Sequence, residues 1–237
     1  MGATLSQALF AQVNTEGLRT KNKEDGLYQS VSLSTSIFGG NTEYFSLSGS
    51  YRMDHVKGQQ NSFFVIDATR SEKNGDNVQD AGFLHGRLIR PFKNNKIEYF
   101  AQREWDAFND LKYRNLIGVG LRFEWDLGDG QQLAIGSGLL LETEHYTGVS
   151  GTEEQFRLTN YISYLKSFKK WTYRNISYLQ PGLDFEDIRG ITDHELHFKV
   201  TDTFGITLNL KGQYDSDPPS SLEKFNYKFK QSLKWVF

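Results

Sequence analysis

The chain has 237 residues, a formal net charge of -2 and no cysteine. The balanced charge argues against a nucleic-acid partner, which requires a basic face. The absence of cysteine excludes disulfides, zinc–thiolate sites and thiol nucleophiles. Only 38% of the residues are hydrophobic, and no stretch supplies the roughly 20 apolar residues that a membrane-spanning helix needs.

The first residues indicate a processing segment and not a part of the fold. Residues 1–11 carry small and apolar side chains without a basic start, so we expect them to be the remnant of a signal peptide whose upstream part is missing. Cleavage is expected after Ala8 or Ala11. Residues 12–26 then form an N-terminal tail, and residues 27–237 form the folded domain.

From Leu27 onward, apolar and polar residues alternate in segment after segment. In residues 27–38, for example, Val31, Leu33 and Ile37 are separated by serines. Because successive side chains of a strand point to opposite faces, this alternation predicts strands with one apolar and one polar face. Turn residues separate about twelve such segments. The expected strands are 27–38, 43–54, 62–70, 81–90, 96–105, 111–125, 132–142, 155–167, 171–181, 191–200, 204–214 and 224–237.

The last of these segments is the most aromatic. Rings at Phe225, Tyr227 and Phe229 alternate with polar residues, and the chain closes on Leu233, Trp235 and Phe237. A closing aromatic strand is a feature by which outer-membrane barrels resemble one another. We therefore expect Phe237, Trp235 and Leu233 to form the C-terminal assembly signal.

This pattern predicts an all-β fold, a transmembrane antiparallel up-and-down β-barrel of about twelve strands. Its apolar face would meet lipid and its polar face a lumen, and the aromatic content of 14% suits girdles at two bilayer interfaces. An even number of strands places both termini, and the tail 12–26, in the periplasm. The longer connections, expected on the outer side, are 71–80, 143–154, 182–190 and 215–221. Within 171–181 the alternation is irregular, and the strand register stays open.

Several local strings resemble a known family. Residues 214–219 read Tyr-Asp-Ser-Asp-Pro-Pro before the last strand, residues 118–122 read Gly-Val-Gly-Leu-Arg, and the chain ends in Trp-Val-Phe. Over most of 42–237 the chain resembles the salt-induced outer-membrane proteins, a Gram-negative family built around one domain of unknown function. The resemblance implies a small barrel in the outer membrane of a Gram-negative bacterium, inserted by the barrel-assembly machinery among lipid and lipopolysaccharide. It brings no catalytic residues, and the sequence names no solute, protein partner or oligomeric state.

The polar faces of the expected strands carry many charges. Two interpretations stay open: a selective pore whose charges tune ion passage, or a lumen filled by salt bridges, which is favoured because about twelve strands enclose little space. The candidate lumen-lining residues are Arg52, Arg87, Glu98, Glu104, Lys112, Arg114, Arg122, Glu124, Glu142, Arg157, Glu195 and Lys199. Further members of the same set are His85, His197, Lys211, Lys228 and Lys230.

A lipid-acting enzyme is a less favoured hypothesis. His194 lies on the apolar side of its strand, and Ser177 and Asn175 on the preceding strand could supply a nucleophile and an orienting amide. One outer-membrane phospholipase is a twelve-stranded barrel with Ser and His on its lipid-facing side, two residues apart on one strand. Here Leu196 follows His194 at that spacing.

Acidic residues gather in two of the expected outer loops. They are Asp184, Glu186 and Asp187 in one loop and Asp215 and Asp217 in the other, without the spacing of an EF-hand. We expect solvated carboxylates, with a calcium site as the alternative. No metal and no cofactor are predicted. The favoured function is a non-enzymatic envelope or stress-related role, and the alternative is a diffusion channel for ions or small solutes.

Overall fold

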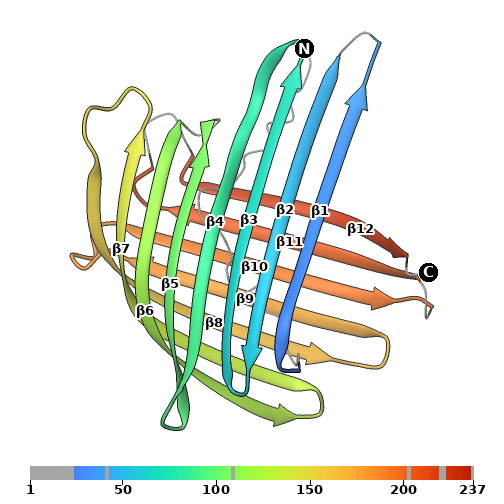
Figure 1. Ribbon diagram of the computed structural model, residues 1–237, viewed down its shortest axis with the longest axis vertical. Coiled ribbons are helices and arrows are strands. Elements are labelled where there is room, and N and C mark those ends of the chain that lie inside the picture. The colour runs from blue at the N-terminus through green and yellow to red at the C-terminus, as the bar shows by residue number, and fades with distance from the viewer. Residues whose placement is uncertain (1–23, 41–42, 108–109, 202–203, 219–222, 236–237) are drawn as a thin grey trace.

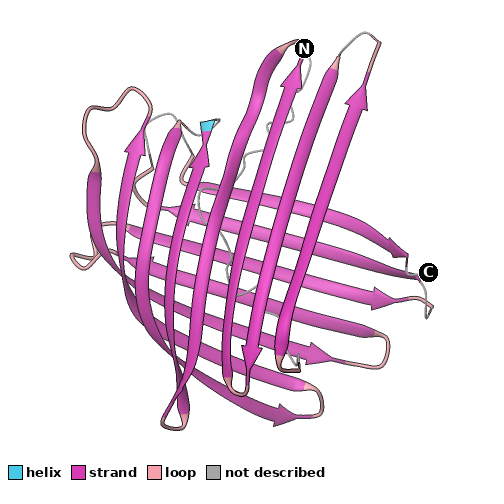
Figure 2. Ribbon diagram, in the orientation of Figure 1, coloured by secondary structure: helices cyan, strands magenta, loops and turns pink. Residues whose placement is uncertain are grey.

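The computed structural model describes residues 24–40, 43–107, 110–201, 204–218 and 223–235. Over these residues the chain forms one sheet of twelve antiparallel strands, each hydrogen-bonded to the next in chain order (Figure 1). Nearly all of the described ribbon is strand (Figure 2). The strands are β1 Gly26–Phe38, β2 Tyr44–Lys57, β3 Gln60–Lys73, β4 Asp76–Phe92, β5 Asn95–Asp106, β6 Leu111–Gly128, β7 Gln131–Tyr146, β8 Glu153–Ser167, β9 Trp171–Pro181, β10 Ile188–Lys199, β11 Phe204–Asp215 and β12 Phe225–Trp235.

The predicted fold class, an all-β antiparallel up-and-down barrel of about twelve strands, is confirmed. The sheet curls so that β8 to β12 pass behind β1 to β4 (Figure 1). Contacts between strands that are not neighbours identify the concave side. Arg189 on β10 reaches Glu142 on β7, and Tyr161 on β8 reaches Glu98 on β5. Within the described ladders, β1 pairs only with β2 and β12 only with β11.

The strands extend further than the alternation predicted. The expected loop 71–80 is wrong, because β3 and β4 continue to a two-residue turn at Asn74 and Gly75, both with positive φ. Asn-Gly is a favoured pair for such a turn because its geometry matches the twist of the flanking strands. The expected loop 143–154 likewise shortens to the residues between β7 and β8.

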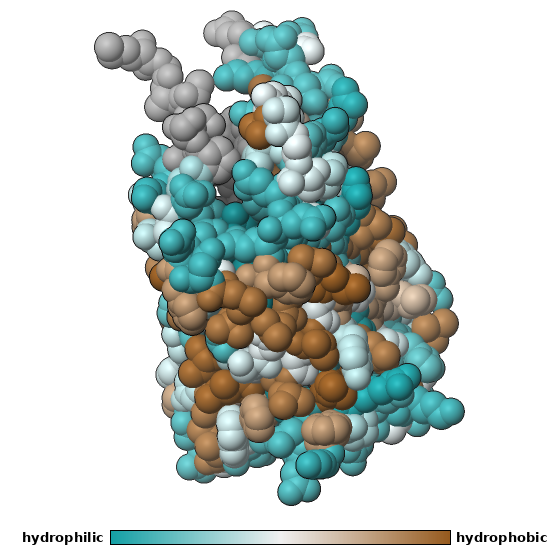
Figure 3. Space-filling view, turned by 90° about the vertical axis from the view of Figure 1, so that its left-hand side faces the viewer, coloured by the Kyte–Doolittle hydropathy of each residue, from teal (hydrophilic) through white to brown (hydrophobic). Residues whose placement is uncertain are grey.

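The outer face of the sheet carries an apolar belt. Figure 3 shows a brown band with hydrophilic rims above and below it. Side chains between 39% and 62% exposed on this face are Ile117, Val119, Leu121, Ile135, Leu139, Phe156 and Ile162. Water solvates such a belt poorly, and an apolar band between polar rims is the surface that fits a bilayer. In the described part of the chain, no helix is long and apolar enough to cross a membrane.

Four glycines lie on the concave side of β6 and β7, and two of them, Gly118 and Gly136, make room for aromatic rings. A Cβ atom at Gly118 would lie 2.3 Å from the Phe100 ring, and one at Gly136 would lie 2.1 Å from the Tyr161 ring. Gly120 and Gly138 lie opposite each other in the same patch. Gly118 and Gly136 therefore admit rings against the backbone, and Gly120 and Gly138 allow close approach of the two strands.

Replacing Gly136 by alanine tests this packing. The added methyl group overlaps Tyr161, so we expect Gly136→Ala to lower the free energy of unfolding by about 1–3 kcal/mol, as overpacked cores do. The matched control is Gly49→Ala on the outer face of β2, where the nearest atom to the new Cβ is 3.8 Å away. Urea unfolding in detergent measures both. Equal stability of the two variants would contradict the packing argument.

Candidate functional site

A buried carboxylate on β7 binds three arginines on the concave side. Glu142 accepts hydrogen bonds from Nε of Arg114, from Nε of Arg157 and from Nη1 of Arg189, the last at 2.9 Å. The three arginines come from β6, β8 and β10, and none of the four residues is more than 6% exposed. One carboxylate thus joins four strands.

Further carboxylates complete the charge balance around these arginines. Glu144 accepts two hydrogen bonds from Arg189, at 2.6 and 3.0 Å, and lies 2.7 Å from Nε of Arg114. Glu104 on β5 accepts from Nη1 of Arg114 at 2.9 Å. We call the whole cluster the outer network, because it lies toward the connections 107–110, 147–152 and 182–187. Its members are Glu104, Arg114, Glu142, Glu144, Arg157, Asp187, Arg189 and Asp215.

Two acidic residues expected to be solvated belong to this network instead. Asp187 accepts from Nη2 of Arg157, and Asp215 lies 3.0 Å from Nε of Arg189. Ser216 joins the two loops, since its hydroxyl accepts from the Ile188 backbone N–H at 2.7 Å and donates to Asp187 at 3.1 Å. Residues 214–217 therefore hold the β9–β10 connection in place beside Arg157 and Arg189.

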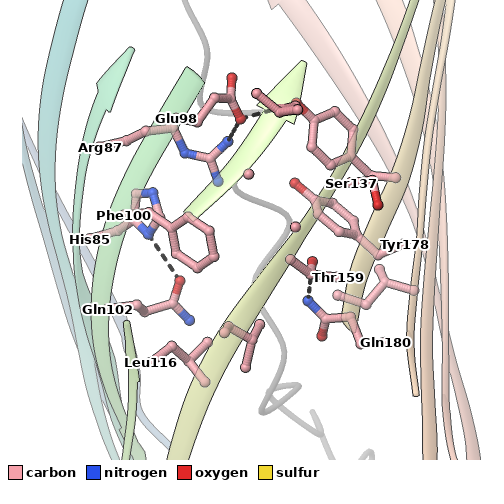
Figure 4. A pocket seen from close by; sticks show the side chains of 16 residues that line it. His85, Arg87, Glu98, Phe100, Gln102, Leu116, Ser137, Thr159, Tyr178 and Gln180 are labelled. Atoms are coloured by element: carbon pink, nitrogen blue, oxygen red, sulfur yellow. Dashed lines mark hydrogen bonds and ion pairs between the residues drawn. The ribbon is translucent and has the colours of Figure 1, made fainter. Parts of the chain in front are cut away.

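A second cluster, the inner network, lies toward the opposite end of the barrel. Glu98 accepts from Arg87 at 3.1 Å and from the Tyr161 hydroxyl at 3.1 Å (Figure 4). Arg122 donates to Tyr161 at 2.8 Å and to Glu124 at 2.5 Å. Lys96 also donates to Glu124, at 2.7 Å. Charges from β4, β5 and β6 are thereby joined, in part through the Tyr161 hydroxyl of β8.

Gln102 on β5 joins His85 on β4 to the outer network, since its amide donates to Glu104 at 3.1 Å while its oxygen lies 3.1 Å from Nδ1 of His85. Beside Gln102 and His85 is a cavity of about 40 Å³, with Thr159 and Gln180 on its far wall (Figure 4). A cavity of that size holds on the order of two or three water molecules. Around this cavity, most of the paired side chains of the two networks are buried on the concave side.

The structure distributes the sequence-predicted residues unevenly. The outer network contains Glu104, Arg114, Glu142 and Arg157, and the inner network contains Arg87, Glu98, Arg122 and Glu124. Outside both networks, Arg52 pairs with Asp54 at 2.6 Å and Glu195 with Arg174 at 3.0 Å. Lys199 is exposed at the end of β10.

Lys112 requires a correction. The ladder between β6 and β7 shifts register between Leu111 and Tyr113, so that Leu111 pairs with Tyr146 and Lys112 is the extra residue of a bulge. Leu111 is 1% exposed, whereas Lys112, expected to line the lumen, is exposed. The bulge reverses the alternation of the two residues.

The expected N-terminal processing segment (1–11) and most of the tail 12–26 lie outside the described residues, as does Phe237 of the assembly signal. Leu233 and Trp235 lie in β12, at register positions opposite Ile206 and Phe204.

Sequence reasoning missed several members of the networks. Glu144 shares the alternation of Glu142, two residues away, and could have been found had the strand been extended to Tyr146. Arg189 and Asp187 were placed in a loop, and no local pattern marks them as partners of β7 and β8. Tyr161 was recognised only as a strand residue.

The outer face of β9 and β10 brings together the residues of the hydrolase hypothesis. In the register of these strands, Asn175 lies opposite His194 and Ser177 opposite Thr192. Nδ1 of His194 lies 2.8 Å from the Tyr173 hydroxyl, and Nε2 lies 3.0 Å from Oγ1 of Thr192. The Ser177 hydroxyl is hydrogen-bonded to Oγ1 of Thr192 at 2.8 Å, and it accepts a longer hydrogen bond from the Asn175 amide at 3.3 Å. The cluster satisfies its polar groups internally.

Comparison with known proteins identifies a family model, described as "Protein of unknown function, DUF481", that matches residues 31–237. No curated protein matches the chain. Among solved structures, the chain is similar to a KdgM porin in complex with disordered oligogalacturonate, at 12% identity and a TM-score of 0.41 over 83% of this chain and 96% of the other. It is also similar to the translocator domain of the autotransporter NalP from Neisseria meningitidis, at 10% identity and a TM-score of 0.43 over 94% and 92%.

Removing the charge of Glu142 tests the outer network. Glu142→Gln leaves three buried arginines short of their shared counter-charge, so we expect a loss of about 3–5 kcal/mol in the free energy of unfolding. The control is Glu72→Gln, because Glu72 pairs with Arg70 at 3.1 Å on the surface, where both side chains are more than a third exposed. Loss of a surface pair costs less than about 1 kcal/mol. Equal unfolding midpoints in urea would contradict the role assigned to Glu142.

Replacing Ser216 by alanine tests the fastening of the β9–β10 connection. Ser216→Ala removes the acceptor of the Ile188 N–H and the donor to Asp187, so we expect faster cleavage of residues 182–187 by an added protease and a loss of stability of about 1–2 kcal/mol. Ser150→Ala, in the exposed β7–β8 connection, is the control. A cleavage rate at 182–187 that matches the control would show that Ser216 does not hold this connection.

Proposed function

The chain belongs to the DUF481 family, and we propose that it is an integral outer-membrane β-barrel of a Gram-negative bacterium with a narrow lumen filled by paired charges. Its role is a non-enzymatic one in the envelope or in a stress response. The apolar belt of Figure 3 supports the membrane location, because contact with lipid stabilises exposed Ile, Leu, Val and Phe side chains relative to contact with water.

Closure of the wall follows from the same proposal. A strand edge exposed to lipid leaves backbone N–H and C=O groups without partners, which a bilayer does not tolerate. We therefore propose that β1 pairs with β12 in the membrane, completing the barrel. Lipid and lipopolysaccharide then surround it, and the barrel-assembly machinery inserts it.

The observation that carries the functional proposal is the burial of the outer network. Arg114 and Arg157 on the two strands next to β7, and Arg189 on β10, converge on Glu142 and are almost inaccessible to solvent. A conducting pore needs hydrated charges that ions can approach and leave. Charges that are already paired with each other hold the wall together and obstruct ion flow.

A diffusion channel is the second candidate, and the cavity of about 40 Å³ between the two networks is the observation in its favour. It is the weaker candidate because the cavity holds only a few water molecules. The hydrolase is weaker still, because Thr192 and Asn175, and not His194, are the bonded neighbours of Ser177 in the described structure.

Planar-bilayer recording tests the proposal. The inserted wild-type barrel should show at most small, rare openings. The double variant Glu142→Ala, Arg157→Ala removes one carboxylate and one arginine together, so the charge stays balanced while the lumen widens; steady openings should appear. The control is Arg70→Ala, Glu72→Ala, which removes the exposed surface pair. Large, stable wild-type conductance would make the diffusion channel the better description.

A further inference from the structure

Two arginines on the outer face of the barrel differ from the others in the described chain. Every other described arginine lies within 3.1 Å of a carboxylate oxygen, whereas no described carboxylate pairs with Arg90 or Arg103. Arg103 lies between the buried Gln102 and Glu104, and Arg90 follows the buried Ile89, so the alternation turns both arginines outward. Of the two, Arg103 is the one that neighbouring side chains hold in place.

Arg103 belongs to a polar level that crosses three strands of the outer face. In the ladder, Arg103 on β5 lies opposite Asn115 on β6, which lies opposite Thr143 on β7. Nη1 of Arg103 donates to the Asn115 side-chain oxygen at 3.2 Å, and the Asn115 amide nitrogen donates to Oγ1 of Thr143 at 3.2 Å. We call these three residues the rim site.

The rim site offers hydrogen-bond donors outward. Nε and Nη2 of Arg103 have no hydrogen-bond partner among the described residues, and the Thr143 hydroxyl, which accepts from Asn115, can also donate. Glu154, the carboxylate at this level of the ladder, lies opposite Thr143 on β8, so its backbone is about 14 Å from that of Arg103 at the usual strand spacing. A guanidinium whose fork is not engaged by a carboxylate is suited to a phosphate, which it binds through two parallel hydrogen bonds.

Aromatic rings fix the position of the guanidinium. Cζ of Arg103 lies 5.0 Å from the centroid of the Tyr113 ring, which stacks on His145 at 5.4 Å. The Tyr113 hydroxyl lies 3.2 Å from Oγ1 of Thr152, and Nδ1 of His145 donates to the Gly151 carbonyl oxygen at 2.5 Å. A cation over a ring is held by the electrostatic field of that ring. Aromatic residues of this kind mark the bilayer interface of outer-membrane barrels.

The next outward level of the ladder, toward the middle of the barrel, is apolar. Ala101 lies opposite Ile117, Ile117 opposite Leu141, and Leu141 opposite Phe156. Ile117 is 62% exposed and Phe156 is 57% exposed. The two levels are two residues apart along each strand, which is about 7 Å. A free anion would use only the donors of the rim site, whereas a lipid places its phosphate on Arg103 and its acyl chains on the apolar level.

We infer that the rim site binds a phosphate group of lipopolysaccharide. The inference deepens the proposed function and rests on it, since it requires the barrel in an outer membrane with the connections 107–110 and 147–152 on the outer side. Lipopolysaccharide forms the outer leaflet there. Its phosphate monoesters carry close to two negative charges and three acceptor oxygens each, more than the phosphodiester of a phospholipid offers to the donors of Arg103 and Thr143.

Titration of the folded full chain in detergent with bisphosphorylated lipid A, the membrane anchor of lipopolysaccharide, tests the inference by native mass spectrometry. Arg103→Gln removes the charge and the fork, so we expect binding to weaken about tenfold, and Thr143→Val removes one donor and should weaken binding roughly threefold. The matched control is Arg90→Gln, which removes the outward arginine at the opposite end of the barrel and should leave lipid A binding unchanged. Heat modifiability in gels reports the folding of each variant, and Thr143→Val carries the test if Arg103→Gln does not fold.

Two further lipids identify the source of the phosphate. Dephosphorylated lipid A and phosphatidylglycerol should both bind the wild-type chain more weakly than bisphosphorylated lipid A, and Arg103→Gln should not change their binding. Wild-type affinity for lipid A in Arg103→Gln or in Thr143→Val, an equal loss in Arg90→Gln, or equal binding of phosphatidylglycerol would each overturn the inference. A barrel that inserts into vesicles without preferring phosphorylated lipid A leaves the proposed function standing, whereas a chain that does not insert removes both.

Discussion

Burying an arginine costs free energy unless a carboxylate matches its charge and acceptors match its N–H groups. The concave side meets this constraint by concentrating the acceptors. Glu142 accepts hydrogen bonds from Arg114, Arg157 and Arg189 together. Glu104 accepts a further bond from Arg114, and Glu144 accepts further bonds from Arg189. Because these residues come from β5, β6, β7, β8 and β10, their pairing also sets how tightly the sheet curls. The burial of these charges follows from this arrangement.

The alternation of side chains determines what each face can do. On the outer side it produces an apolar belt, and on the inner side it produces charges on β4 to β10 and hydroxyls on β1 to β3. One sequence pattern thus yields an outer face suited to lipid and an inner face lined mainly by polar side chains, both on the same backbone geometry.

Strand positions were predictable because a period of two is a strong signal over long segments. All twelve expected strands are present, and the starts of β6, β9 and β11 agree to the residue. The positions of the turns were harder to predict. Asn74 and Gly75 make a tight turn within what looked like a polar loop, since residues on either side continue the ladder while remaining hydrophilic.

The charge networks could be predicted only in part. Alternation indicates that Arg114 and Glu142 share a face, but it cannot indicate which arginine meets which carboxylate across the lumen. That pairing depends on the curl of the sheet. The bulge at Leu111–Tyr113 could not be predicted from the alternation either. The extra residue Lys112 has no sequence signature, and it reverses the faces on which Leu111 and Lys112 lie. Loop acids such as Asp187 look solvated until the partner strand is placed.

The most direct test of the filled lumen is the exchange of arginine Nε–H protons with deuterated water, followed by nuclear magnetic resonance on the protein inserted in lipid nanodiscs. Protons of Arg114 and Arg157, bonded to Glu142, should exchange far more slowly than that of Arg70 on the surface. Exchange of Arg114 and Arg157 as fast as that of Arg70 would show a water-filled pore, and would contradict a lumen closed by paired charges.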